Sequence, residues 1–343
     1  MIAPSLVRVL PLLAIVAFSS GCDLTKLTAN STAGLFQRAA PAFEQHWDYD
    51  LAGAALPGNI VQMEGLMRVV PENEIIVMNG VRLYTAYAYG WIEDQVEEAQ
   101  DRGDYDEANR LMLRARYMYQ RSRDLAVHRV SLDHEGYQEA YDAGLDRFRA
   151  WLQEEFTEPE DAEGLLWIGY SWGSYINASK DDMVAVADLP FAQALVERSV
   201  ELDRTQFNYA GMIFLAVVAT SAPGADLEEA GPMWEAAIEA TERKNLLLLV
   251  NMARTYAVKR QDRALYTSLL REVLEAGDIN PEQRLTNMIA KRRAARYLRQ
   301  IDERIPPQPE PQASAPAAPP TPPAPPATPP ADNAPVPPPA PGR

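Results

Sequence analysis

Between residues 46 and 304, apolar positions recur with the period of an amphipathic helix. The clearest stripe has i, i+3, i+4, i+7 spacing and comprises Leu246, Leu249, Val250, Ala253, Tyr256 and Ala257. After a polar turn at 260–262, a second stripe comprises Tyr266, Leu269, Leu270, Val273 and Leu274. Gly277 follows this second helix, and Pro281 stands at the start of the next one. Because the connecting turn is short, the two helices are predicted to pack antiparallel.

The same helix–turn–helix unit recurs elsewhere in the chain. A helix from Ile92 to Gln100 is followed by a polar turn and a second helix through Ala126. Gly103, Tyr105 and Ala108 match the turn and second-helix signature of a tetratricopeptide repeat (TPR). Further helices are predicted over 192–202 and 234–240, at irregular spacing. The best strand signal, residues 75–77, runs on into helix-like spacing. We therefore predict an all-α array of antiparallel, degenerate TPR-like hairpins over residues 46–304.

The N-terminal residues have the features of an exported lipoprotein. One positive charge, Arg8, precedes the apolar stretch 9–18, which is too short to span a bilayer but fits a signal sequence. Small residues then lead to Cys22, the only cysteine. We predict a signal peptide over 1–21, cleavage before Cys22, and lipid on its sulfur and amino group. Residues 22–45 then form a tether and a first helix. The alternative is an ordinary signal peptide with an incidental cysteine.

The predicted anchor sets the location of the protein. Lipid on Cys22 tethers the chain to a bacterial membrane on its periplasmic side. Asp23 follows the cysteine, and in enteric bacteria an aspartate there favours retention at the inner membrane. We therefore expect the inner rather than the outer membrane.

The C-terminal residues 305–343 have a composition that builds no core. From Pro306 onward, 18 of 38 residues are proline, and alanine is the commonest of the others. Such a segment is predicted to be disordered and polyproline-like, with a reach on the order of 100 Å. It is either a passive spacer or a contact to the cell wall or to a partner with a groove.

Charge is distributed unevenly along the chain. Residues 22–343 contain 31 basic and 48 acidic residues, a net charge of −17, which excludes nucleic-acid binding through a basic face. Residues 254–304 run against this trend, with 12 basic and 7 acidic side chains. One explanation of this local excess is that the basic side chains lie on solvent-exposed helix faces. The other is that the basic C-terminal helices meet an acidic surface on a partner or on another copy.

Residues 169–173 read G-x-S-x-G, the pattern of the nucleophile elbow in α/β-hydrolases. That fold needs its catalytic histidine after the serine, yet His46, His128 and His134 all precede Ser171. We therefore interpret this stretch as a helix packed through small residues and keep a serine hydrolase at Ser171 only as a remote alternative. No catalytic residue, metal site or cofactor is predicted.

Aromatic residues gather in the same stretch. Trp167 and Tyr170 lie on one face of the predicted helix, and Trp172 and Tyr175 lie on another. One face belongs to the core, and the other is a candidate surface for a ligand or partner, because Trp and Tyr suit half-wet sites. We add two polar residues that follow on the chain, so that the candidate surface comprises Trp167, Tyr170, Trp172, Tyr175, Asn177 and Lys180. Lys180 supplies a positive charge that suits a carboxylate.

Two ordered sets of short motifs resemble the TatT family, lipoproteins associated with tripartite ATP-independent periplasmic (TRAP) transporters. The first set comprises residues 54–58, 64–66, 70–73 and 84–90; the second comprises 166–173, 179–182 and 187–190. The resemblance covers roughly residues 45–280. It implies an all-helical array of TPR-like hairpins, a homotrimer with a pore through each protomer, and a periplasmic solute-binding protein as the partner. It implies no catalytic residues.

The residues and the resemblance together lead to one expected function. We expect a non-enzymatic periplasmic lipoprotein that docks the solute-binding protein of a TRAP transporter and binds or relays a small, partly apolar ligand. The alternative is an envelope scaffold or assembly protein whose repeats and tail organise other proteins without a ligand.

Overall fold

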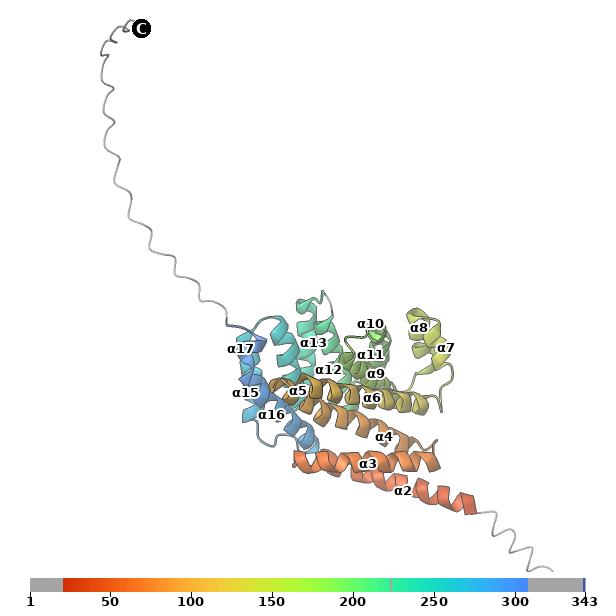
Figure 1. The fold of residues 1–343 in the computed structure, drawn as a ribbon. Coiled ribbons are helices and arrows are strands. Elements are labelled where there is room, and N and C mark those ends of the chain that lie inside the picture. Colours follow the sequence, from red (N-terminus) through yellow and green to blue (C-terminus); the bar gives the residue numbers. More distant parts are fainter. Residues whose placement is uncertain (1–20, 223, 308–341, 343) are drawn as a thin grey trace, which may run out of the picture. The chain divides into compact units, whose positions relative to one another are not determined.

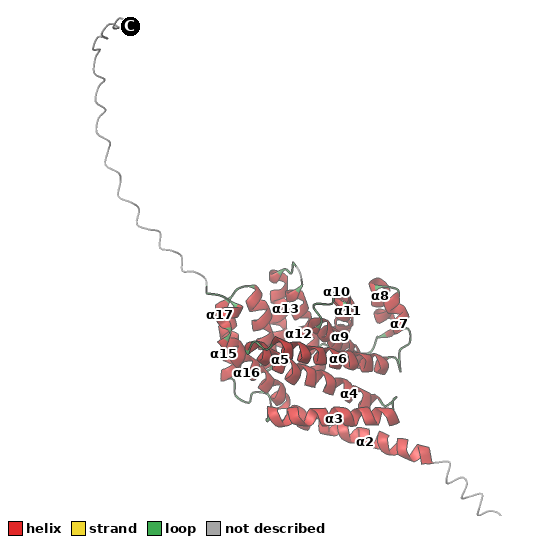
Figure 2. Ribbon diagram, viewed as in Figure 1, coloured by secondary structure: helices red, strands yellow, loops and turns green. Residues whose placement is uncertain are grey.

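The computed structural model describes residues 21–222, 224–307 and 342, with side chains from residue 25 onward, and the helical body ends at Ile305. The predicted signal peptide falls outside the described residues, except for Gly21. So does most of the predicted tail. Within the described ranges every regular element is a helix, and none is a strand (Figures 1 and 2). The prediction of an all-α fold is confirmed.

The helices follow one another through short connections. The first half of the body contains α2 (Gly21–Glu44), α3 (Tyr49–Val69), α4 (Glu74–Tyr87), η1 (Ala88–Ile92), α5 (Glu93–Asp101), α6 (Tyr105–Val130), α7 (Tyr137–Asp142), α8 (Leu145–Glu155), η2 (Pro159–Asp161) and α9 (Ala162–Ala178). The second half contains α10 (Met183–Ala187), α11 (Leu189–Asp203), α12 (Gln206–Ser221), α13 (Leu227–Ala240), α14 (Leu246–Met252), η3 (Ala253–Ala257), α15 (Arg263–Glu275), η4 (Pro281–Gln283), α16 (Arg284–Arg299) and α17 (Ile301–Arg304).

Two hairpins use the same turn chemistry. Gly103 and Gln261 both have positive φ, 74° and 56°, and each ends a turn between antiparallel helices. The next residues, Asp104 and Asp262, accept a hydrogen bond from a backbone N–H in the first turn of α6 and α15. Both hairpins were predicted from the sequence. Asn73 caps α4 in the same way, so the apolar run at 75–77 begins a helix rather than a strand.

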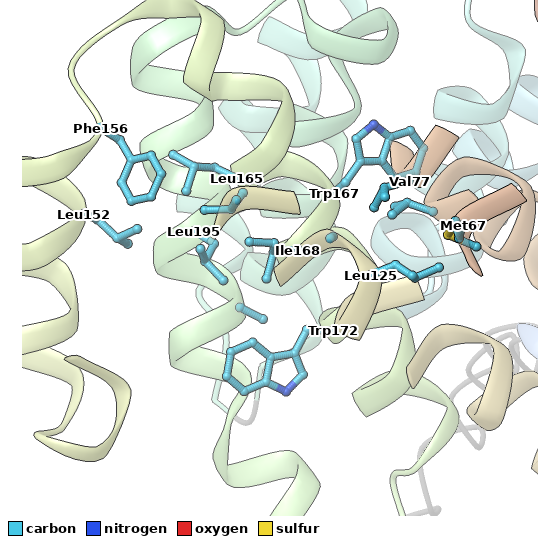
Figure 3. Packing of buried hydrophobic residues seen from close by; sticks show 14 of the residues in the cluster. Met67, Val77, Leu125, Leu152, Phe156, Leu165, Trp167, Ile168, Trp172 and Leu195 are labelled. Atoms are coloured by element: carbon cyan, nitrogen blue, oxygen red, sulfur yellow. The ribbon is translucent and has the colours of Figure 1, made fainter. Parts of the chain in front are cut away.

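The main core forms around α9, which packs against α6 on one side and α11 on the other. Trp167, Ile168 and Trp172 project from α9 into this core, as Figure 3 shows. The contact with α11 is close because Gly169 lacks a side chain: a Cβ atom there would lie 2.7 Å from the carbonyl oxygen of Ala192. Small residues therefore allow α9 to pack against its neighbours.

Helices α5 and α16 are joined by buried charges. Asp94 accepts hydrogen bonds from Arg296 (Nη1–Oδ1, 2.6 Å) and Arg292 (Nε–Oδ2, 2.5 Å), and Arg296 also bonds Glu97 (2.7 Å). The side chains of Asp94 and Arg296 are only 3% and 5% exposed. We call Asp94, Glu97, Arg292 and Arg296 the α5–α16 charge cluster. The acidic surface that α16 meets here thus belongs to the same chain, which is neither of the two explanations considered from the sequence.

Membrane-spanning helices were also sought among the described residues. None of the helices there has both the length and the apolar character needed to cross a bilayer.

Candidate functional site

A largely apolar pocket of ≈ 380 Å³ lies between helices that are far apart in the sequence. Its volume is typical of small-molecule sites, which are concave and mostly apolar with a few polar groups. The helices α2, α4 and α16 supply most of its wall, with further residues from α3, η1, α9, α12 and α14. Its apolar lining includes Phe36, Phe43, Met63, Leu83, Trp91, Leu247, Leu285 and Ile289. We call this space the α2 pocket.

Helix α2 forms one wall of the α2 pocket through Phe36, Phe43 and Glu44. Among the described side chains of α2, only Ala29 and Ala33 are buried. Burial raises the pKa of the Glu44 carboxyl, and the nearby charge of Arg82 opposes that shift. This wall is therefore held by few buried contacts.

A strained turn lies at another side of the pocket. Phe207, Asn208 and Tyr209 have φ values of 45°, 56° and 63°, a left-handed conformation that is costly for residues other than glycine. The turn places the ring of Phe207 against Trp167, with a centroid distance of 4.8 Å and an edge-on orientation. A hydrogen bond from Asn245 Nδ2 to the carbonyl oxygen of Asn208 (3.2 Å) holds it. Strain of this kind gathers at functional sites.

Two residues of the pocket wall have buried polar atoms without partners among the described residues. The Tyr89 hydroxyl and Trp167 Nε1 are buried and have no hydrogen-bond partner among the described residues. Both residues line the pocket. Buried donors are nearly always paired in native proteins, so two unpaired groups in one wall need an explanation.

A buried arginine packs against the ring of Tyr89. The Arg293 guanidinium lies 4.0 Å from the centre of the Tyr89 ring and donates to the Tyr89 carbonyl oxygen (2.6 Å). Arg293 is 1% exposed, and its Nε and Nη1 atoms have no partner among the described residues. Glu93, 3.4 Å away, also accepts a hydrogen bond from the Tyr119 hydroxyl (2.6 Å).

The pKa values of nearby groups reflect this environment. Burial raises the pKa of the Tyr170 hydroxyl, and the charge of Glu93 adds to the shift. The side chain of Lys180 is exposed, but partial burial of its ammonium group lowers its pKa, and the positive charge of Arg254 lowers it further. Arg254 and Lys180 make no ion pair within the part of the chain that the structure describes.

The structure separates the residues of the predicted ligand or partner surface into three places. Trp167 and Tyr170 line the α2 pocket. Trp172 is 3% exposed and packs in the main core, and the half-buried Tyr175 lies beneath Arg123, 5.9 Å from its ring centre. Asn177 and Lys180 are exposed at the C-terminal end of α9.

The G-x-S-x-G stretch lies inside α9 rather than in a strand-to-helix turn. Ser171 is fully buried and donates a hydrogen bond to the carbonyl oxygen of Trp167 (2.6 Å). Its other close neighbours are hydroxyls, those of Ser122 (3.0 Å) and Thr85 (3.5 Å). This geometry offers no exposed nucleophile.

Several pocket residues were missed from the sequence. Tyr89 stands within one of the family-like motifs, 84–90, but nothing in its spacing shows that it faces a cavity. Tyr89 lies in the π-helical turn η1. A second such turn, η3, contains Arg254, which does not line the pocket. Such turns frequently occur at functional sites, and periodicity alone does not reveal them. Phe207 gave no sequence signal.

The helical body that contains this pocket matches a family model described as TRAP transporter T-component, over residues 45–304. The chain belongs to the TRAP transporter T-component family. The match covers the pocket-lining residues from Asn59 onward and confirms the resemblance to TatT; those of α2, which supply one wall, precede it. Comparison with curated proteins gives no significant match. Family membership associates the chain with a TRAP transporter in the bacterial envelope, as an accessory component of transport.

Proposed function

We propose that this protein is a non-enzymatic, lipid-anchored periplasmic component that docks the solute-binding protein of its TRAP transporter and binds a small ligand in the α2 pocket. The observation that carries the proposal is the pocket itself: a mostly apolar cavity of ≈ 380 Å³ between α2 and the matched domain. Its few polar groups suit recognition of a small molecule.

The proposed anchor is Cys22, cleaved from its signal peptide and held at the inner membrane as Asp23 suggests. Helix α2 begins at Gly21 and runs from this point to the pocket wall. Lipidation therefore places the pocket close to the membrane in which the transporter lies. Labelling with a palmitate analogue, followed by membrane fractionation, tests the proposed lipid anchor. A Cys22→Ala variant is expected to lose the label and to appear in the soluble periplasmic fraction.

The exposed end of α9 is the proposed contact for the solute-binding protein. Asn177 and Lys180 are exposed there, and Asp181 forms an ion pair with Arg116 beside them. An exposed positive charge on an otherwise acidic protein orients a binding partner and raises the rate at which it associates. By family resemblance we also propose a homotrimer with a pore through each protomer, which sedimentation measurements test.

The decisive experiment measures binding between the purified solute-binding protein and the body without its tail, by calorimetry. Lys180→Ala and Asn177→Ala are expected to weaken the complex severalfold while the helical circular dichroism stays unchanged. Lys244→Ala, an exposed lysine on a different turn, is the matched control. Undiminished binding in both α9 variants refutes this docking surface, and no binding by the wild type refutes the partner and favours a scaffold role.

A further inference from the structure

Helices α2 and α3 form an outer layer of the body. They run side by side, and both pack on α4 (Figure 1). On the solvent side of this layer, Leu27 and Leu35 of α2 are 62% and 66% exposed, and Leu51 of α3 is 57% exposed. Single exposed leucines are common on proteins, whereas a group of them on adjacent helices marks a surface that meets another phase or molecule. The body itself leaves this surface uncovered.

The exposed leucines of α2 lie opposite its buried side. Successive residues of an α-helix are about 100° apart around its axis, so Leu27, Ser31 and Leu35 lie within about a quarter of the circumference. Ala29 and Ala33, which are buried, lie on the other side. The two leucines therefore point away from the body and do not belong to its core.

The outward side of α3 is apolar as well. Between Leu51 and Gly65 its exposed positions hold Leu, Ala, Gly, Val and Gln and no charged side chain. Glu64 is half-buried and accepts a hydrogen bond from Arg121 (Nε–Oε1, 2.8 Å). A surface helix normally has charged or polar residues on its outward side. We call the exposed sides of α2 (residues 27–42) and of α3 (residues 51–69) the α2–α3 outer face.

The charges around this face are opposite in sign to the net charge of the chain. Lys26, Arg38 and Arg68 outnumber Asp50 among the exposed side chains that the structure describes on α2 and α3, although the whole chain has a net charge of −16. The next acidic residue along the chain, Glu72, lies beyond the end of α3. Basic residues beside an apolar helix face suit anionic lipid headgroups. A second copy of the same face would instead bring like charges together.

The proposed anchor lies at one end of the same face. Helix α2 begins at Gly21, so no flexible linker separates Cys22 from the helix. At about 1.5 Å per residue, Leu27 lies about 7.5 Å along the axis from Cys22, and Leu35 lies about 20 Å from it. Lipid on Cys22 thus holds the first exposed leucine near the headgroups.

We propose that the α2–α3 outer face docks on the surface of the bilayer that holds the lipid anchor, with Leu27, Leu35 and Leu51 in the headgroup region. The proposal rests on the lipid anchor of the proposed function and adds the orientation of the body. An interfacial helix of this kind buries its apolar side about 5–10 Å into the headgroup boundary. The lipid then fixes one point of the body, and the face fixes which side meets the membrane.

Fluorescent labelling of the full chain tests the proposal. Cys22 is the only cysteine and its sulfur carries the proposed lipid, so an introduced cysteine is the only free thiol. Ser31→Cys on α2 and Gln62→Cys on α3 receive a nitrobenzoxadiazole (NBD) label, and the lipidated protein is reconstituted into vesicles of phosphatidylethanolamine and phosphatidylglycerol. Both labels are expected to shift their emission to the blue and to lose about half of it to lipids that carry a nitroxide near the headgroup. Ser268→Cys, exposed on α15, is the matched control and is expected to show neither change.

A second pair of variants removes the apolar contact and leaves the anchor in place. Leu27→Glu combined with Leu35→Glu is expected to lower the nitroxide quenching at Gln62→Cys at least about threefold, because membrane binding of such a helix scales with its buried apolar area. The protein should still float with the vesicles through its lipid. Leu113→Glu combined with Leu274→Glu adds the same charge at exposed leucines of α6 and α15 and should leave the quenching unchanged.

The outcomes separate this proposal from the anchor on which it rests. If the vesicle-bound protein shows aqueous emission at both labels, the face does not dock and the anchor stands. A blue shift without nitroxide quenching means that another protein or a second copy covers the face, and it overturns the proposal. A chain that incorporates no palmitate analogue and does not float with the vesicles refutes the anchor and the docking together.

Discussion

Removing Asp94 from the α5–α16 charge cluster is expected to destabilise the whole body. In Asp94→Asn, Arg296 and Arg292 lose a shared carboxylate that is 3% exposed, at N–O distances of 2.6 and 2.5 Å. Breaking a buried ion pair by removing one partner costs about 3–5 kcal/mol. Because Arg296 keeps Glu97 at 2.7 Å, we expect the lower end, about 3 kcal/mol. For a domain of this size that lowers the melting temperature by about 6–12 °C.

Thermal unfolding followed by circular dichroism at 222 nm and pH 7 is the assay. Asp133→Asn is the matched control, because Asp133 also pairs with an arginine (2.6 Å) but is 50% exposed. Exposed pairs contribute about 0–1 kcal/mol, so this variant should melt within about 4 °C of the wild type. If Asp94→Asn melts no lower than Asp133→Asn, the cluster does not hold α5 to α16 and the reasoning fails.

Two further predictions concern the stability of the body at low pH and the packing of α9 against α11. Burial raises the pKa values of Asp94 and Glu97, but their arginine partners outweigh it and hold both below the ordinary range. The stabilisation by these two carboxylates is therefore present above the unfolded-state pKa of about 4 and is lost as the pH falls below it. In urea titrations between pH 6 and 3, the free energy of unfolding should fall more steeply for the wild type than for Asp94→Asn. Gly169→Ala places a Cβ atom 2.7 Å from the Ala192 carbonyl oxygen, so it is expected to lower the free energy of unfolding in urea by about 1–3 kcal/mol. The control is Gly65→Ala, where a Cβ atom has no neighbour within 4 Å; it should be neutral or stabilising. Equal stability of the two glycine variants contradicts the close α9–α11 packing.

The sequence predicts features that depend on neighbouring residues. Helical periodicity located both stripes between Leu246 and Leu274, and Gly103 marked a turn that does require positive φ. The G-x-S-x-G stretch was correctly interpreted as a helix with small packing residues, because no histidine follows Ser171. These inferences need only spacing and local backbone chemistry, which one sequence contains.

The pocket depends on residues that the fold alone brings together. Phe36, Tyr89, Trp167 and Ile289 line one cavity although they come from α2, η1, α9 and α16. No periodicity relates them. The acidic partner of α16 within the same chain could not be predicted for the same reason, since charge counts show a local excess but not the distant helix α5 that neutralises it. The aromatic residues of α9 could be divided into two faces, but which face meets the cavity depends on the neighbours of that helix.

The joining of α5 to α16 has a consequence for how this protein unfolds. In an open repeat array, each hairpin touches only its neighbours, so the ends fray independently and repeats are added or lost without harm. Here Asp94 and Arg296 are separated by 202 residues of sequence, and their contact closes a long loop through most of the body. Fraying at the C-terminal end must therefore break a contact deep in the first half. The body should unfold as a single cooperative unit, and inserting a hairpin between the two helices should cost far more than one local interface.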